Sequence, residues 1–124
     1  MRKIVVFNKM TDPLTHELEV FSRVEGVEVV KSPAVTEEEL IRDAKDAEVI
    51  LFTSAKRTRK VLENLDSCKL IVRYGIGYDT VDTDLCRTLG IALYNVPAYC
   101  SDSVAQITLA MALTLASHLT EYRG

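Results

Sequence analysis

The sequence predicts an α/β fold in which helices cover both faces of a five-stranded parallel sheet. Three observations support it. Short, continuous apolar runs recur along the chain, each is followed by a segment with helical spacing, and glycine or proline often separates the two. Continuous apolar runs are typical of parallel strands buried on both faces. Five strand–helix units in a row favour a doubly wound, flavodoxin-like sheet.

The elements follow one another with clear boundary signals. The threonine and glutamate of Thr36–Glu39 match a capping box, Asp12-Pro13 opens the first helix, and Gly26 and Gly90 end helices. Strands are predicted at the apolar runs 4–7, 27–30, 48–52, 69–73 and 91–95. Helices are predicted at about 13–24, 37–44, 57–65 and 83–89.

The last predicted helix has an unusual composition. It begins with Ser101 or Asp102 as its N-cap, extends to about Leu119, and is apolar nearly all round, whereas a surface helix shows one apolar stripe. Its polar residues and its length argue against a membrane span. We therefore expect residues 1–100 to form one domain. Residues 101–124 would be an interdomain helix that begins a second domain, and the chain would be a fragment.

The stretch 68–82 contains the clearest candidate site. Gly75, Ile76 and Gly77 follow the predicted strand 69–73, at the sheet edge where parallel α/β folds bind ligands. Glycine lets the backbone approach a ligand closely, although a plain turn that needs positive φ is the alternative interpretation. A dinucleotide fingerprint would need glycine at Thr80 and an acid at Asn95, so this turn is not one.

Composition and motifs exclude several other function classes. The net charge of −3 argues against nucleic-acid or membrane partners. Three cysteines without CxxC spacing indicate neither a disulfide framework nor a zinc site, and they favour a cytoplasmic protein. We find no metal-ligand cluster, hydrolase motif or phospho-receiver acids. Asp79 and Asp82 are better explained as caps than as a catalytic pair, so the chain lacks a complete catalytic set.

The segments RYGIGYDTVD and GIALYNVPAYCSDSVAQITLAMALTLA resemble the D-isomer-specific 2-hydroxyacid dehydrogenase family, with a match over about 48–119. The NVPAYC stretch is most similar to bacterial relatives of the C-terminal-binding-protein type. The resemblance implies a two-domain NAD enzyme with its active site between the domains. This chain would be the substrate-binding domain plus the helix that crosses to a missing Rossmann domain.

The resemblance also implies residue roles. The amides of Ile76 and Gly77 would contact the substrate carboxylate, and Ile76 would also lie near the nicotinamide of NAD. The remaining implied contacts are Ser54, Gly75 and Ser101 for the substrate, and Val104 and Ile107 for the cofactor. The family's catalytic arginine, glutamate and histidine and its GxGxxG motif belong to the other domain, so no catalytic residue is assigned here and the fragment alone should be inactive.

Two departures from the family pattern stand out. Gln106 replaces a usual acid. Thr53 replaces an arginine that phosphoglycerate-using members carry, which argues against phosphoglycerate unless Lys56 or Arg57 substitutes for that arginine. The expected partners are a small 2-hydroxy or 2-oxo acid and a second copy in a homodimer, and the fragment should self-associate through its last helix. Alternatives are a corepressor-like, nucleotide-sensing binding module of the same fold, or a stand-alone flavodoxin-like domain with another ligand.

Overall fold

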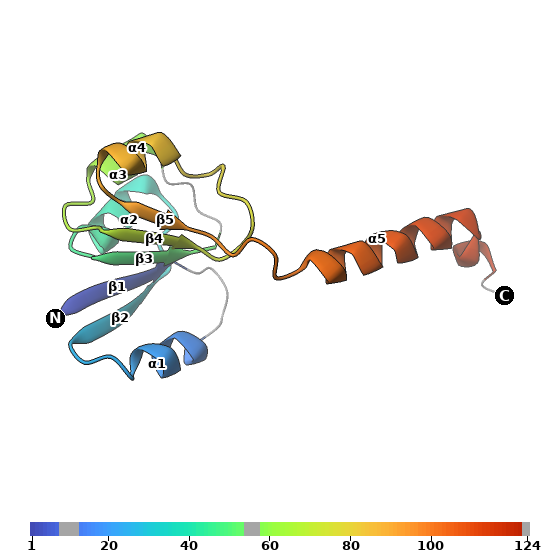
Figure 1. Cartoon of the computed structure of the whole chain (residues 1–124), viewed down its shortest axis with the longest axis horizontal. Coiled ribbons are helices and arrows are strands. Elements are labelled where there is room, and N and C mark those ends of the chain that lie inside the picture. Colours follow the sequence, from blue (N-terminus) through green and yellow to red (C-terminus); the bar gives the residue numbers. More distant parts are fainter. Residues whose placement is uncertain (8–12, 54–57, 123–124) are drawn as a thin grey trace.

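The computed structural model describes residues 1–7, 13–53 and 58–122. Its centre is a parallel five-stranded sheet in the order β2-β1-β3-β4-β5, which is the predicted flavodoxin-like arrangement (Figure 1). Each predicted strand is present, with its ends shifted by at most two residues. The strands are β1 (Arg2–Phe7), β2 (Val27–Ser32), β3 (Val49–Phe52), β4 (Leu70–Arg73) and β5 (Ala92–Tyr94).

Helices lie on both faces of the sheet, as predicted. Alternate residues of β1 enter two apolar clusters: Val5 and Phe7 pack with α2, α3 and α4, while Ile4 and Val6 pack on the side of α1. This alternation explains why the strand is a continuous apolar run. The helices are α1 (Thr15–Phe21), α2 (Glu37–Ala44), α3 (Arg59–Glu63), α4 (Thr83–Thr88), α5 (Ser101–Ala116) and the 3-10 helix η1 (Leu119–Glu121).

Two of the predicted caps are confirmed. The Thr36 hydroxyl accepts a hydrogen bond from the Glu39 N–H at 3.3 Å, and the Glu39 carboxylate accepts one from the Thr36 N–H at 3.1 Å. Asp82 accepts from the Leu85 N–H at 2.9 Å and so caps α4. The predicted ends of the first helix are wrong: Pro13 is not part of it, because Leu14 takes a left-handed conformation as its N-cap, and the helix ends at Phe21, well before Gly26. The third helix is also shorter than predicted, since it starts after Thr58 as its N-cap and ends at Glu63.

The predicted ends of α5 are wrong. Cys100, rather than Ser101 or Asp102, is the N-cap residue: its carbonyl accepts the first helical hydrogen bond, from the Val104 N–H at 2.9 Å, and no side chain caps the helix. The α-helix stops at Ala116 because His118 takes a left-handed conformation with φ of 53°.

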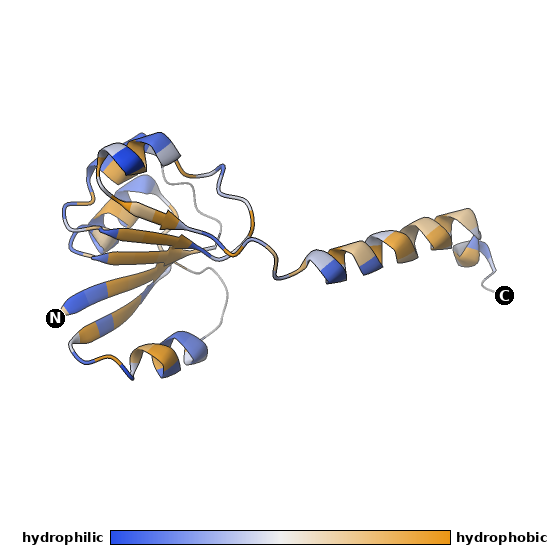
Figure 2. Cartoon of the chain, in the orientation of Figure 1, coloured by the Kyte–Doolittle hydropathy of each residue, from blue (hydrophilic) through white to orange (hydrophobic). Residues whose placement is uncertain are grey.

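Helix α5 projects away from the rest of the molecule and carries apolar residues on all sides (Figures 1 and 2). All of its residues are exposed except Thr114, which is half-buried. No helix in the part of the chain that the structure describes has the length and apolar character to cross a membrane. The division into 1–100 and 101–124 stays a prediction.

Candidate functional site

The glycine turn is held tightly at the carboxyl end of β4. The Gly75 N–H donates to the Arg73 carbonyl at 2.9 Å, and the Tyr74 N–H donates to the Phe52 carbonyl of the neighbouring strand at 2.8 Å. Gly75 has a φ of +154°, which favours glycine, and a Cβ built on it would lie 1.3 Å from Nη1 of Arg73. Both the backbone angle and the close approach of Arg73 therefore require glycine at this position.

Two backbone amides of the turn are left available. The Val96 N–H donates to the Gly75 carbonyl at 3.0 Å, and Asn95 Nδ2 donates to the Ile76 carbonyl at 2.7 Å. Because N–H and C=O of a trans peptide point in opposite directions, the N–H groups of Ile76 and Gly77 point away from residues 95 and 96. Within 1–7, 13–53 and 58–122 nothing accepts from them. Neighbouring unpaired N–H groups of this kind attract anions.

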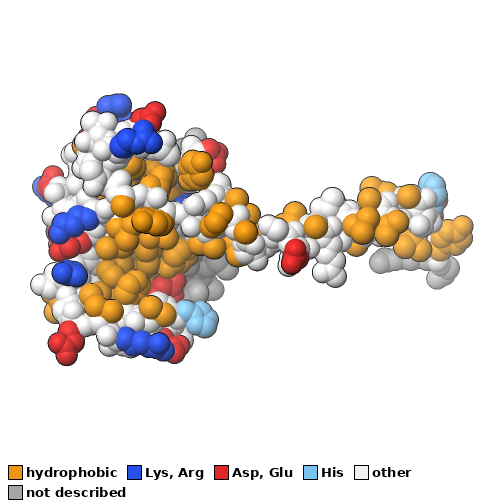
Figure 3. All heavy atoms as spheres, viewed as in Figure 1, with side chains coloured by type: hydrophobic (Ala, Val, Ile, Leu, Met, Phe, Trp, Pro, Cys, Tyr) orange, Lys and Arg blue, Asp and Glu red, His pale blue; other side chains and the backbone are white. Residues whose placement is uncertain are grey.

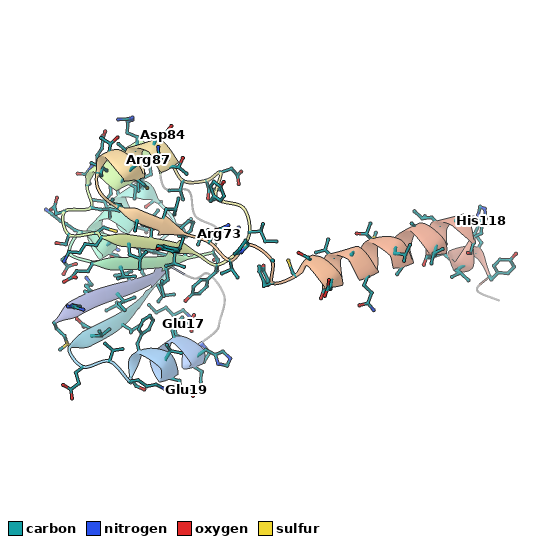
Figure 4. The ribbon with its side chains drawn as sticks, in the orientation of Figure 1. Glu17, Glu19, Arg73, Asp84, Arg87 and His118 are labelled. Carbon is teal, nitrogen blue, oxygen red and sulfur yellow. The ribbon has the colours of Figure 1, made fainter. Side chains whose placement is uncertain are left out.

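Arg73 adds a positive charge beside these amides (Figure 4). The side chain is half-buried and lies against Gly75, and its Nη1 donates to the Tyr74 carbonyl at 3.2 Å. Its Nε is buried without a hydrogen-bond partner, and no carboxylate among the described residues forms an ion pair with it. A half-buried cation without a counter-ion favours an anionic ligand. The sequence analysis missed Arg73, although a charge that ends an apolar strand was a usable signal.

A separate groove of about 540 Å³ lies between α4 and β5 and meets the turn at Tyr78 and Asn95. Cys86 lines it, and burial raises the pKa of this thiol above its ordinary value. A raised pKa leaves little thiolate at neutral pH, so Cys86 is a poor nucleophile. Among the described residues, no group of three or more His, Cys, Asp or Glu is placed to hold a metal ion.

The structure brings together only part of the predicted site. Gly75, Ile76 and Gly77 form one loop, whereas Ser101 is the exposed first residue of α5. Val104 and Ile107 are 54% and 57% exposed on α5, which leads away from the sheet, so they are not gathered around Ile76. Ser54 lies outside the described residues. The segment that borders the loop instead is 95–96, through its two hydrogen bonds.

Comparisons with known proteins identify relatives of this chain. The family "D-isomer specific 2-hydroxyacid dehydrogenase, catalytic domain" matches residues 4–121. A D-3-phosphoglycerate dehydrogenase of Methanocaldococcus jannaschii is 36% identical over 98% of this chain and 22% of its own length. A hydroxypyruvate reductase of Thermotoga maritima is 30% identical over 89% of this chain and 36% of its own length.

Solved structures of dehydrogenases resemble this chain in fold as well. The NAD+-bound 3-phosphoglycerate dehydrogenase of Entamoeba histolytica superposes with a TM-score of 0.79 at 27% identity, over 91% of this chain and 38% of that one. The Aquifex aeolicus D-lactate dehydrogenase complexed with NAD and lactic acid superposes with a TM-score of 0.75 at 26% identity, over 97% of this chain and 35% of that one. The chain thus spans between about a fifth and two fifths of these relatives. It belongs to the D-isomer specific 2-hydroxyacid dehydrogenase family.

Proposed function

We propose that this chain is the substrate-binding portion of an NAD-dependent oxidoreductase that interconverts a D-2-hydroxy acid and a 2-oxo acid. The observation that carries the proposal is the pair of unpaired amides at Ile76 and Gly77, held at the carboxyl edge of the sheet by the bonds to Asn95 and Val96. A carboxylate is the group common to all such acids, and two N–H groups aimed to one side can bind its oxygens.

Arg73 would strengthen this carboxylate site. Its guanidinium lies against Gly75, the residue before the two amides, so its charge acts on any anion bound there. With the carboxylate fixed at one end, the carbon that carries the hydroxyl group is held in one orientation, and positioning of this kind is a large part of catalysis. The catalytic acid–base groups would come from outside residues 1–124.

NAD, when bound, would accept or supply the hydride. Ile76, Val104 and Ile107 are exposed apolar side chains, which suits contact with a nicotinamide ring. The sequence holds no GxGxxG motif for the pyrophosphate. We therefore propose that residues 1–100 bind the acid, that 101–124 lead into the domain that binds most of NAD, and that this chain alone does not transfer hydride.

Nuclear magnetic resonance on the isotope-labelled chain tests the carboxylate site. Adding a 2-hydroxy acid should shift the amide resonances of Ile76 and Gly77 before others. The carboxamide of the same acid, which lacks the negative charge, should shift these two resonances much less. An Arg73→Met variant should weaken the response to the acid and leave the response to its amide unchanged. Equal shifts with acid and amide would refute a carboxylate site.

Testing the proposed enzymatic activity requires the gene that encodes this chain. The coding sequence should be read beyond Gly124, and whatever open frame is found should be expressed and assayed with NADH and a panel of 2-oxo acids. Turnover of at least one acid is expected. Binding of nucleotide without turnover of any acid would instead support the corepressor-like alternative.

A further inference from the structure

The outer edge of β5 has backbone groups that can pair with another strand. β5 ends the sheet and pairs with β4 alone, and its Ala92 N–H donates to the Lys69 carbonyl at 2.9 Å. Because successive residues of a strand alternate, the N–H and C=O of Leu93 point to the other side, away from β4. Neither group has a hydrogen-bond partner among the residues that the structure describes.

The sequence of β5 does not protect this edge. Natural edge strands often carry Lys or Pro against unwanted pairing, and none of Ala92, Leu93 and Tyr94 is either. Figure 3 shows hydrophobic side chains gathered over the sheet, with charged side chains around them. Tyr94 and the following Val96 are 64% and 40% exposed. With three residues β5 offers few backbone hydrogen bonds, so side-chain pockets must supply most of the affinity for an added strand.

The groove between α4 and β5 provides such a pocket. The half-buried Leu93 side chain packs into the apolar cluster on the α4 side of the sheet. In antiparallel pairing, the residue directly opposite Leu93 places its side chain on the same side. Buried Cys86 and Ile91 line the groove next to Leu93, and its volume of about 540 Å³ lies within the range of ligand pockets.

Arg87 gives the groove a positive charge at one end. Among the described residues that line the groove it is the one charged side chain. It lies where β5 begins, because the Gly90 N–H donates to its carbonyl at 3.2 Å. Its ion pair with Asp84 at 2.8 Å (Figure 4) is exposed on both sides, and exposed pairs contribute little to stability. The guanidinium can therefore turn to a second carboxylate, which indicates an acidic ligand.

We propose that β5 binds an extended peptide of a partner protein, which pairs antiparallel with Leu93 and brings an acidic side chain to Arg87. In this direction, the peptide residue opposite Leu93 and the one two positions later both face the groove. The first fills the apolar part beside Leu93, and the second reaches Arg87 where β5 begins. The recognised motif is therefore an apolar residue followed two positions later by Asp or Glu.

A second copy of this chain fits the same edge less well. If two β5 strands paired antiparallel around Leu93, Asn95 of the second copy would lie opposite Ile91. Arg87 would then face an amide instead of a carboxylate. Helix α5 does not cover the edge either, because it projects away from its own sheet (Figure 1). Charge complementarity thus favours a partner that supplies an acid.

Selection from a library of random peptides on the 124-residue chain tests the motif. Peptides with the apolar-x-acid spacing should be enriched, and Arg87→Glu should weaken their binding by about fivefold or more. A selected peptide with Lys in place of its acid should prefer that variant. Arg23→Glu is the matched control, because Arg23 also forms an exposed ion pair, with Glu19 at 3.3 Å, and lies outside the groove. It should leave binding unchanged.

Hydrogen exchange and backbone methylation of a selected peptide test the strand pairing. The Leu93 N–H should exchange rapidly in the free chain and lose this rapid exchange when the peptide is bound. N-methylation of the peptide residue opposite Leu93 should abolish binding. Methylation of the next residue should not, because alternate N–H groups of a strand point away from its partner.

Several results would overturn the proposal. These are no enriched peptide, enriched peptides without an acid, an equal loss of binding in Arg23→Glu, or methylation that acts alike at both positions. A bound peptide that leaves the exchange of Leu93 unchanged would place the site elsewhere. Protection of Leu93 that rises with the concentration of the chain alone would show that a second copy occupies the edge instead.

Discussion

Replacing Gly75 by alanine tests the geometry of the glycine loop most directly. At a φ of +154° an alanine is strained, at about 1–3 kcal/mol. The new Cβ would also fall 1.3 Å from Arg73 Nη1, so the guanidinium must leave and its 3.2 Å hydrogen bond to the Tyr74 carbonyl is lost. That bond contributes about 1 kcal/mol. The free energy of unfolding should therefore fall by about 2–4 kcal/mol, the sum of these two effects.

Urea denaturation at one protein concentration measures this loss, and two comparisons separate its parts. Gly26→Ala has similar left-handed strain at φ +75° but nothing within 4 Å of its Cβ, so it should cost only about 1 kcal/mol. In an Arg73→Ala background, Gly75→Ala should cost about 1 kcal/mol less than in the unmodified chain, because the collision is gone. If Gly75→Ala cost the same in both backgrounds, the guanidinium would not lie over Gly75, and the reasoning about the anion site would fail.

Three further predictions concern single side chains. Asp82→Ala should destabilise the chain by about 1 kcal/mol, because α4 loses its N-cap. Thermal melting measures this loss, and an unchanged melting temperature would mean that water replaces the cap. Hydrogen bonds from Arg42 and Ser32 lower the pKa of Asp43 below its ordinary 3.8. The Asp43 carboxylate therefore stabilises the fold fully above pH 3.8, and this stabilisation is lost as pH falls through the lowered folded-state pKa. Ser32→Ala should move that pKa up toward its ordinary value in a carbon-detected NMR titration, and an unchanged pKa would rule out the contribution of Ser32. Asn95→Ala frees the Ile76 carbonyl, so binding of a 2-hydroxy acid in the NMR titration should weaken by about fivefold; unchanged binding would show that Asn95 does not orient the loop.

Local patterns in the sequence determined the sheet and most of its helices. Continuous apolar runs predicted each strand, although only β1 and β3 are buried over most of their length and the edge strand β5 is largely exposed. The caps at Thr36 and Asp82 were predictable because a cap and the N–H groups that it binds lie within three residues. The ends of α5 were not, because no side chain caps its first turn and the left-handed turn at His118 leaves no pattern in the sequence.

The glycine turn was visible in the sequence, since positive φ and close backbone approach both select glycine. What only the tertiary structure decided is the geometry on which the proposed anion site depends. Asn95 reaches back across 19 residues to hold the Ile76 carbonyl, and Arg73 folds over Gly75 without a carboxylate partner in the described part of the chain. The outward course of α5 is likewise a property of the tertiary structure. Periodicity along a chain shows which side of each element is apolar, but which surface covers it depends on how distant segments meet in space.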